Sequence, residues 1–313
     1  MGILKRVIPI LLIIICCVSP VAAAELIPGG QVIGLRLEDG SVYIAGFDPE
    51  LGGLAQQAGL KAGDRILTAD GKPITCPDGL RKALAASHGT VELSVLRSGK
   101  TKKVRLSPAI TADGPRLGVY LRQGISGLGT VTYYLPDGSF GALGHGVLDG
   151  AAPIAFEKGT VCGVQLLSVR RGTAGQPGQL LGSLQEATQL GSADKNTAQG
   201  IFGKVTPPLE ATLSTGKAQV GEAVIRATVD GDGLREYSVQ ILKLYAGGDR
   251  CRNLLLKITD PELLQKTGGI VQGMSGSPII QDGNLVGAVT HVLVNDPTTG
   301  YGIFIENMLD AAA

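Results

Sequence analysis

Short runs of β-branched and apolar residues, separated by Gly or Pro, recur from about residue 117 to the C-terminus. The clearest are residues 130–134, 164–169, 222–229, 237–245, 254–258, 285–294 and 301–305. Helix signals are scarce in this stretch, and glycine supplies 47 of the 313 residues, well above its usual share. Many short strands at regular spacing predict a β-barrel or β-sandwich domain.

Charge and hydropathy exclude several classes of protein. The 28 basic and 27 acidic residues leave a formal net charge of +1, so no net field attracts nucleic acid or an anionic membrane surface. A hydrophobic content of 44% with a mean hydropathy of +0.23 excludes a disordered chain. The length is ample for one large domain or two modest ones.

The N-terminus carries an export signal. Lys5 and Arg6 precede an apolar run over residues 7–18, and Ala22 and Ala24 fit an A-x-A cleavage site. The run is also nearly long enough to span a bilayer as an uncleaved anchor. Residues 1–24 are therefore predicted to be a signal peptide or an N-terminal membrane anchor, and both readings stay open.

The exported part contains three cysteines, Cys76, Cys162 and Cys251, which cannot all pair with one another. No C-x-x-C motif occurs, and the three histidines lack ligand-like spacing. Free thiols are favoured over a metal site or a redox pair, and we expect neither a metal nor a cofactor.

Residues 31–106 combine short strands, two short helical stretches and many glycines. The string over residues 58–67, AGLKAGDRIL, is followed by a DGKPI turn and a helix signal, and it resembles the bacterial PDZ domain. The resemblance implies a PDZ domain over residues 27–107 and an edge strand that accepts a peptide by β-augmentation at Gly34, Leu35, Arg36 and Leu37. A small mixed domain without a ligand is the alternative. The proline-bracketed residues 108–116 are predicted to be a linker.

The hexamer GMSGSP at residues 273–278 is the candidate nucleophile turn. A serine between glycines can be exposed on a tight turn, where backbone N–H groups can face a developing oxyanion. Ser275 is the candidate nucleophile, and the amides of Gly273 and Ser275 are the candidate oxyanion hole. The hexamer resembles the G-D-S-G-G-P signature of chymotrypsin-like peptidases, with Met274 in place of the acid. Activation through an ion pair at that position is therefore not expected; a simple glycine-rich β-turn is the alternative.

His145, in the glycine-flanked stretch at residues 141–147, is the candidate general base, because a near-neutral pKa suits proton transfer. A structural histidine is the alternative for His145. For His291 two roles stay open: it could line the specificity pocket, or it could be a structural histidine in a strand. Spacing does not identify the carboxylate that would orient the imidazole. Asp260, followed by Pro261, has the pattern of a helix N-cap. The available carboxylates are Asp149, Asp230, Asp232, Asp249 and Asp260.

Further motifs follow one another in the order found in the SpoIVB peptidase family, the sporulation serine peptidases, which the chain resembles over about residues 27–310. They are residues 28–34, the PDZ string, and residues 117–120, 141–145, 257–260, 268–280, 287–292 and 295–298. The resemblance implies a mainly β chain, with an α+β PDZ domain followed by a chymotrypsin/trypsin-like double β-barrel peptidase domain over residues 117–313. It also implies catalysis by His145 as base, Ser275 as nucleophile and Asp260 as third member.

The family's function provides the remaining expectations. The enzyme is secreted into the space between the forespore and mother-cell membranes, cleaves itself, and cuts the regulatory subunit of an intramembrane protease complex, which activates a late sigma factor. The implied partners are that protein substrate, a peptide ligand of the PDZ domain, and the membrane through the N-terminal segment, with no nucleic acid. The alternatives are an exported PDZ scaffold that does not cut, and a general quality-control protease.

Overall fold

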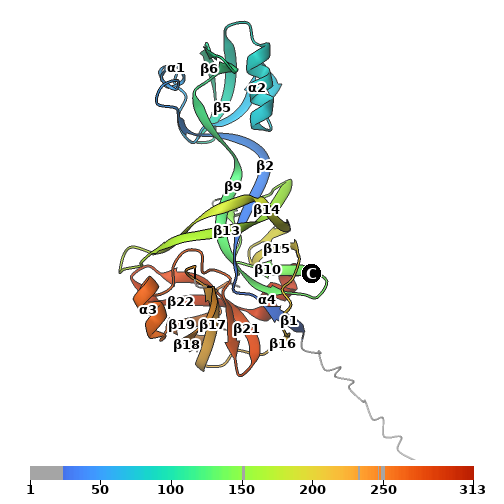
Figure 1. Cartoon of the computed structure of the whole chain (residues 1–313), viewed down its shortest axis with the longest axis vertical. Coiled ribbons are helices and arrows are strands. Elements are labelled where there is room, and N and C mark those ends of the chain that lie inside the picture. The colour runs from blue at the N-terminus through green and yellow to red at the C-terminus, as the bar shows by residue number, and fades with distance from the viewer. Residues whose placement is uncertain (1–23, 150–151, 232, 246, 248–250) are drawn as a thin grey trace, which may run out of the picture.

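The structure is a computed structural model that describes residues 24–149, 152–231, 233–245, 247 and 251–313. The predicted export segment lies outside these residues except for Ala24. Figure 1 shows a small lobe with α1, α2, β5 and β6, joined by the long strands β2 and β9 to a larger body that holds most of the remaining strands. Within the described residues, no helix is long and apolar enough to cross a membrane.

The first half of the larger body is a ring of six antiparallel strands. Pairing runs from β9 through β10, β15, β14, β13 and β2 and back to β9. Val131, Phe140, Val161 and Ile201 are among the side chains that fill its core. The strands are β2 (Val32–Phe47), β9 (Val119–Tyr134), β10 (Ser139–Ala142), β13 (Lys158–Arg170), β14 (Gln179–Thr197) and β15 (Gly200–Val205).

The second half is a closed barrel with the strand order β17-β18-β19-β22-β21-β20. Alternate residues of β17 and β18 are buried, which is the period of two expected of a strand with one face on a core. The strands are β17 (Gly221–Thr228), β18 (Leu234–Leu244), β19 (Leu254–Ile258), β20 (Pro278–Gln281), β21 (Asn284–Leu293) and β22 (Asp296–Phe304). Two six-stranded barrels confirm the mainly β, trypsin-like architecture predicted from the spacing of the β-branched runs and from the family resemblance.

Short elements complete the body. Helix α3 (Pro261–Thr267) connects β19 to the segment before β20, and α4 (Ile305–Ala312) ends the chain. Strand β1 (Glu25–Pro28) pairs with β9 and with β16 (Leu213–Ser214), while β11 (Leu148–Asp149) and β12 (Ala152–Pro153) form a small hairpin.

The small lobe corresponds to the predicted PDZ domain. It is built from the second half of β2, the first half of β9 and a separate core that includes Ile44, Ile66, Leu80 and Val95. Helix α2 starts at Pro77, with the Sγ of Cys76 accepting a hydrogen bond from the N–H of Gly79. The other elements are α1 (Gly53–Gln57), β3 (Arg65–Ala69), β4 (Lys72–Pro73), α2 (Pro77–Ala86), β5 (Val91–Arg97) and β6 (Lys100–Leu106).

Strands β2 and β9 each belong to both lobes, so the small lobe is inserted into the larger body. Residues 34–38 pair with β13 in the first barrel, and residues 42–47 pair with β9 in the small lobe. The start at residue 27 predicted for the PDZ domain therefore includes a segment whose partners are strands of the first barrel. The predicted linker at residues 108–116 contains a hairpin of β7 (Ala109–Thr111) and β8 (Gly114–Arg116).

The predicted peptide-binding edge at Gly34, Leu35, Arg36 and Leu37 is wrong. These residues pair with β13 on one side and with residues 125–128 of β9 on the other. β-Augmentation needs a strand whose backbone N–H and C=O groups are free on one edge. Both edges are occupied here, because β2 is a central strand where it crosses the barrel.

Candidate active site

His145 and Ser275 line one cavity of about 400 Å³ at the junction of the two barrels. Leu128 and Leu143 contribute apolar walls from the first barrel, and Thr290 and His291 of β21 contribute from the second. The two residues that the sequence predicts as base and nucleophile therefore face the same space. The remaining lining residues are Pro177, Ile270, Val271, Gln272, Gly273, Val292 and Val294.

The nucleophile turn depends on two glycines with left-handed backbone conformations. Gly273 has φ of +103° and Gly276 has φ of +97°, which L side chains rarely adopt. A Cβ at Gly276 would lie 2.0 Å from the carbonyl oxygen of Thr130 and 2.6 Å from the amide nitrogen of Leu143. Gly276 therefore lets the turn pack directly against the first barrel.

Strand β9 of the first barrel holds this turn by three hydrogen bonds. The N–H of Thr130 donates to the carbonyl of Ser275 at 3.0 Å, and its Oγ1 donates to the carbonyl of Gly273 at 2.7 Å. Thr132 Oγ1 donates to the carbonyl of Gly276 at 2.8 Å. Both threonines are fully buried. Sequence reasoning missed them, although two threonines at positions i and i+2 of an apolar strand share one face and are a usable signal.

The predicted oxyanion donors are available. In the part of the chain that the structure describes, no backbone or side-chain acceptor takes the N–H of Gly273 or of Ser275. Both residues line the cavity. Two unengaged backbone amides, one of the serine itself and one two residues before it, are the donors that an oxyanion hole needs.

Met274 does not mimic the acid that it replaces. Its side chain is fully buried in the core of the second barrel. An apolar side chain there stabilises the turn by packing and offers no partner for a cation.

The Ser275 hydroxyl donates to the carbonyl oxygen of Thr290 at 2.7 Å. A hydroxyl has one hydrogen, so in this arrangement its proton is directed at β21. Attack on a substrate requires Ser275 Oγ to turn toward the imidazole within the cavity that both residues line.

His145 follows a turn in which Leu143 and Gly144 have φ of +70° and +69°. Its Nδ1 lies 3.0 Å from the carbonyl oxygen of Gly146, and because a carbonyl only accepts, Nδ1 carries the hydrogen. This tautomer leaves Nε2 as the basic nitrogen. Burial lowers the pKa of His145 below its ordinary value of 6.5, and the bond to Gly146 opposes that shift. The ring is therefore neutral and able to accept a proton at pH 7.

His291 packs against this base, with a distance of 5.1 Å between the centroids of the two imidazole rings. Its place in the cavity wall agrees with the pocket role that the sequence left open for it.

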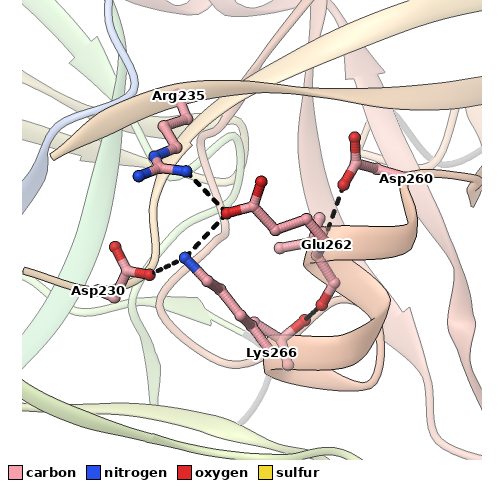
Figure 2. Close-up of polar contacts among 7 residues, drawn as sticks. Asp230, Arg235, Asp260, Glu262 and Lys266 are labelled. Atoms are coloured by element: carbon pink, nitrogen blue, oxygen red, sulfur yellow. Dashed lines mark hydrogen bonds and ion pairs between the residues drawn. The ribbon is translucent and has the colours of Figure 1, made fainter. Parts of the chain in front are cut away.

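Asp260 occupies the N-cap of α3. Its Oδ1 accepts a hydrogen bond from the N–H of Leu263 at 2.9 Å, and its Oδ2 accepts one from the N–H of Ser238 at 3.4 Å. Figure 2 shows the carboxylate directed at the start of the helix. Asp260 does not line the cavity around His145, and no described contact joins the two side chains. The cap predicted from the Asp-Pro pattern is present, and the catalytic role of Asp260 stays a prediction.

Among the other candidate carboxylates, Asp230 is the one whose side chain the structure describes. Asp230 forms an ion pair with Lys266, which also contacts Glu262 at 3.0 Å, and Glu262 contacts Arg235 at 2.8 Å (Figure 2). These pairs raise the pKa of the Lys266 ammonium and connect α3 to β18. Asp232, Asp249 and the side chain of Asp149 lie outside the described part of the chain.

A second candidate site lies in the PDZ domain, where residues 119–123 of β9 pair with β2 on one edge. No described strand takes the other edge, and a cavity of about 220 Å³ with both apolar and charged lining residues lies between this segment and α2. Leu80 and Leu84 of α2 and Leu117 and Val119 line it. An open strand edge beside a groove that a neighbouring helix lines is the arrangement required for β-augmentation.

Among the described residues no cysteine is in a disulfide: Cys162 and Cys251 are buried and Cys76 is half-buried. This agrees with the expectation from their number and spacing. Among the residues that the structure describes, no group of three His, Cys, Asp or Glu side chains is arranged to hold a metal ion.

Two β-barrels whose junction presents a serine, a histidine and two free amides to one cavity define a serine peptidase of trypsin-like architecture. The chain belongs to the SpoIVB peptidase family, because the model of the SpoIVB peptidase S55 family matches residues 114–309, more than half of its length. A PDZ domain model matches residues 48–97.

Solved structures similar to this chain include the Rv3671c protease of M. tuberculosis in its active form, with 16% identity and a TM-score of 0.37. That match covers 60% of this chain and 73% of the other. The inactive form of the Rv3671c protease matches with 14% identity and a TM-score of 0.34, covering 59% of this chain and 82% of that one.

Proposed function

We propose that this serine peptidase is an exported endopeptidase of sporulation that cuts a regulatory membrane protein, and so triggers intramembrane proteolysis and activation of a late sigma factor. The observation that supports hydrolysis is the shared cavity of His145 and Ser275, beside the free amides of Gly273 and Ser275. Membership of the SpoIVB family supports the regulatory substrate and self-cleavage.

The proposed reaction uses an acyl-enzyme. Ser275 Oγ turns from the Thr290 carbonyl and attacks the scissile carbonyl carbon while His145 Nε2 takes its proton. The N–H groups of Gly273 and Ser275 stabilise the oxyanion of the tetrahedral intermediate. His145 then gives the proton to the leaving amine. In the second half of the reaction His145 takes a proton from water, the water oxygen attacks the ester carbonyl, and the proton passes to Ser275 Oγ as the acyl group leaves.

A fluorophosphonate probe tests this proposal. Labelling of the wild-type chain and its absence in Ser275→Ala is the expected result, because the probe reacts with an activated serine. The matched control is Ser277→Ala, two residues away and buried, which should still label. Absence of labelling in the wild-type chain, or equal labelling of wild type and Ser275→Ala, would contradict hydrolysis by Ser275.

The second candidate function is an exported PDZ scaffold that binds peptides without cutting them. The hydrogen bond of Ser275 to the Thr290 carbonyl favours it, since that bond withholds the hydroxyl from the base. A chain that binds peptides but never reacts with the probe is the result that this candidate predicts. Broad degradation of casein would instead indicate a general quality-control protease.

For the PDZ partner, we propose a peptide that adds to residues 119–123 of β9 beside α2. Titration of a peptide ligand, followed by NMR, should shift the amide signals of those residues. Shifts centred on residues 34–37 would contradict this placement, because that segment is paired on both edges.

For localisation, we propose export across the cytoplasmic membrane into the space between the forespore and mother-cell membranes, with anchoring by residues 1–24 until self-cleavage. The apolar run and its basic flank support the export step. Peptide mapping of the exported form tests the whole assignment at once: a mature N-terminus after Ala24 indicates signal removal, and one further along the chain indicates self-cleavage.

A further inference from the structure

The hairpin of β13 and β14 extends beyond the first barrel and reaches the second. We call residues 164–184 the bridging arm; Figure 1 shows it extending toward α3 and β22. At its tip, the N–H of Gly172 donates to the carbonyl of Thr267, and the N–H of Gly175 donates to the carbonyl of Val294, both at 2.8 Å. The arm is thus bonded to the second half of the body at one residue that precedes the nucleophile turn in the sequence and at one that follows it.

The arm also engages the residue that precedes the oxyanion hole. The N–H of Gln272 donates to the carbonyl of Gly178 at 2.9 Å, and the N–H of Leu180 donates to the carbonyl of Gln272 at 2.8 Å. Both backbone polar groups of Gln272 are therefore bonded to the arm.

This pair of bonds fixes the direction of the Gly273 N–H. In a trans peptide the C=O of one residue and the N–H of the next point in opposite directions. Because the Gln272 carbonyl is directed at Leu180, the Gly273 N–H points away from the arm, and no described acceptor takes it. Reversal of this peptide would turn a carbonyl oxygen toward the place where the oxyanion must form.

The Leu180 side chain supports the same peptide from the apolar side. It is 2% exposed and joins the core of the second barrel although its strand belongs to the first. A Cβ at Gly273 would lie 3.0 to 3.1 Å from three atoms of Leu180, so the two residues are in close contact. Met274 cannot form a buried ion pair, and the arm supplies a different constraint on the turn.

We propose that the bridging arm orients the oxyanion hole, with Leu180 as the positioning residue that holds the Gln272–Gly273 peptide in its productive direction. This inference rests on the proposed acyl-enzyme chemistry of Ser275. By this proposal the first barrel both provides His145 and orients the oxyanion donors of the second barrel.

The test compares Leu180→Ala with Leu181→Ala, whose side chain is 39% exposed on the opposite face of the strand. Leu180→Ala should lower kcat by about 10-fold to 100-fold, because a misdirected oxyanion donor loses stabilisation only in the transition state. KM should stay within about twofold. Affinity for a peptide boronate, which mimics the tetrahedral intermediate, should fall by the same factor as kcat, while affinity for the cleaved product peptide should not change.

A backbone variant separates orientation from packing. Replacing Leu180 by its α-hydroxy acid removes the N–H that bonds Gln272 and keeps the side chain, and it should reproduce the loss of kcat and of boronate affinity. Leu180→Met keeps the N–H and a side chain of similar volume, so its kcat and its boronate affinity should stay close to those of the wild-type chain.

Unchanged boronate affinity in both Leu180→Ala and the α-hydroxy variant would overturn the proposal, as would an equal loss in Leu181→Ala. The α-hydroxy variant decides the case if Leu180→Ala does not fold. Fluorophosphonate labelling of the wild-type chain is checked first, because its absence would contradict the proposed function itself and not the role of the arm.

Discussion

The two barrels hold their catalytic residues in different ways. The Ser275 turn is fixed by bonds from outside its own barrel, from Thr130 and Thr132 of β9 and through Gln272 to the bridging arm. His145 is oriented by a bond to its neighbour Gly146 and by ring contact with His291. The nucleophile and its oxyanion donors are therefore preorganised by interbarrel hydrogen bonds, whereas the base forms its hydrogen bond within its own turn and meets the second barrel through the ring of His291. Activity should therefore depend strongly on packing between the barrels.

The largest effect on this comparison is expected from Gly276→Ala. The new Cβ would meet the Thr130 carbonyl at 2.0 Å, so the turn must move away from β9. We expect kcat to fall by at least about 100-fold, because displacement of the reacting groups by an ångström has an effect of that size. Gly283→Ala is the control: Gly283 also has positive φ, +74°, but its Cβ would meet nothing within 4 Å. Equal loss of activity in both variants would show that backbone strain, and not interbarrel packing, controls the site.

The acid limb of the pH profile tests the base. Burial lowers the pKa of His145 below 6.5, so the neutral ring that accepts the proton persists to lower pH than an ordinary histidine would allow. We expect kcat/KM to fall tenfold per pH unit below a midpoint that lies under 6.5. Folding stability should also decrease as the pH falls below 6.5, since the unfolded chain then binds more protons than the folded one. A midpoint above 6.5 would place a negative charge next to the ring and contradict the local arrangement.

A smaller loss is expected when one interbarrel bond is removed. Thr130→Val deletes the 2.7 Å bond to the Gly273 carbonyl and leaves that acceptor without its partner, at a cost of about 1–3 kcal/mol. If half of that cost falls on the transition state, kcat decreases by about 2-fold to 13-fold. Thr130→Ser keeps the hydroxyl and should stay close to wild type. Steady-state kinetics measures the effect on kcat, and thermal melting measures the effect on stability. An unchanged kcat in Thr130→Val would contradict a role of β9 in positioning the catalytic turn.

The smallest effect is expected from Asp260→Asn. Asparagine caps helices about as well as aspartate, so the bond to the Leu263 N–H should survive and stability should change by only a few tenths of a kcal/mol. Since no described contact joins Asp260 to His145, kcat should stay within about threefold. A loss of about 10⁴-fold with unchanged stability would instead establish Asp260 as the third member implied by the family resemblance.

The sequence was sufficient for features that depend on local chemistry. Residue spacing predicted the barrel strands, the glycine pattern at residues 273–278 predicted the exposed turn, and the Asp260-Pro261 pair predicted a helix cap that is present. Each of these depends on residues close together in the chain. Even Met274 could be interpreted, because replacing an acid by an apolar side chain excludes an ion pair regardless of the fold.

Features that depend on strand neighbours could not be predicted in the same way. The alternation of residues in β2 indicates which side chains are buried but not which strands lie on either edge, so Gly34–Leu37 could not be distinguished from an open edge. Likewise, nothing near Leu180 in the sequence indicates that it packs on Gly273, which lies far along the chain. Long-range pairing decides both, and the strands shared between the two lobes made the domain limits ambiguous.

Reaction with a peptide chloromethyl ketone, followed by peptide mapping, tests most directly whether the two barrels bring His145 and Ser275 into one reacting pair. The reagent is held by an attacking serine while it alkylates a ring nitrogen within reach, so it reports both groups in one molecule. We predict alkylation of His145 in the wild-type chain and none in Ser275→Ala. Alkylation of His291 in place of His145, or alkylation of His145 that is unaffected by loss of Ser275, would contradict the account.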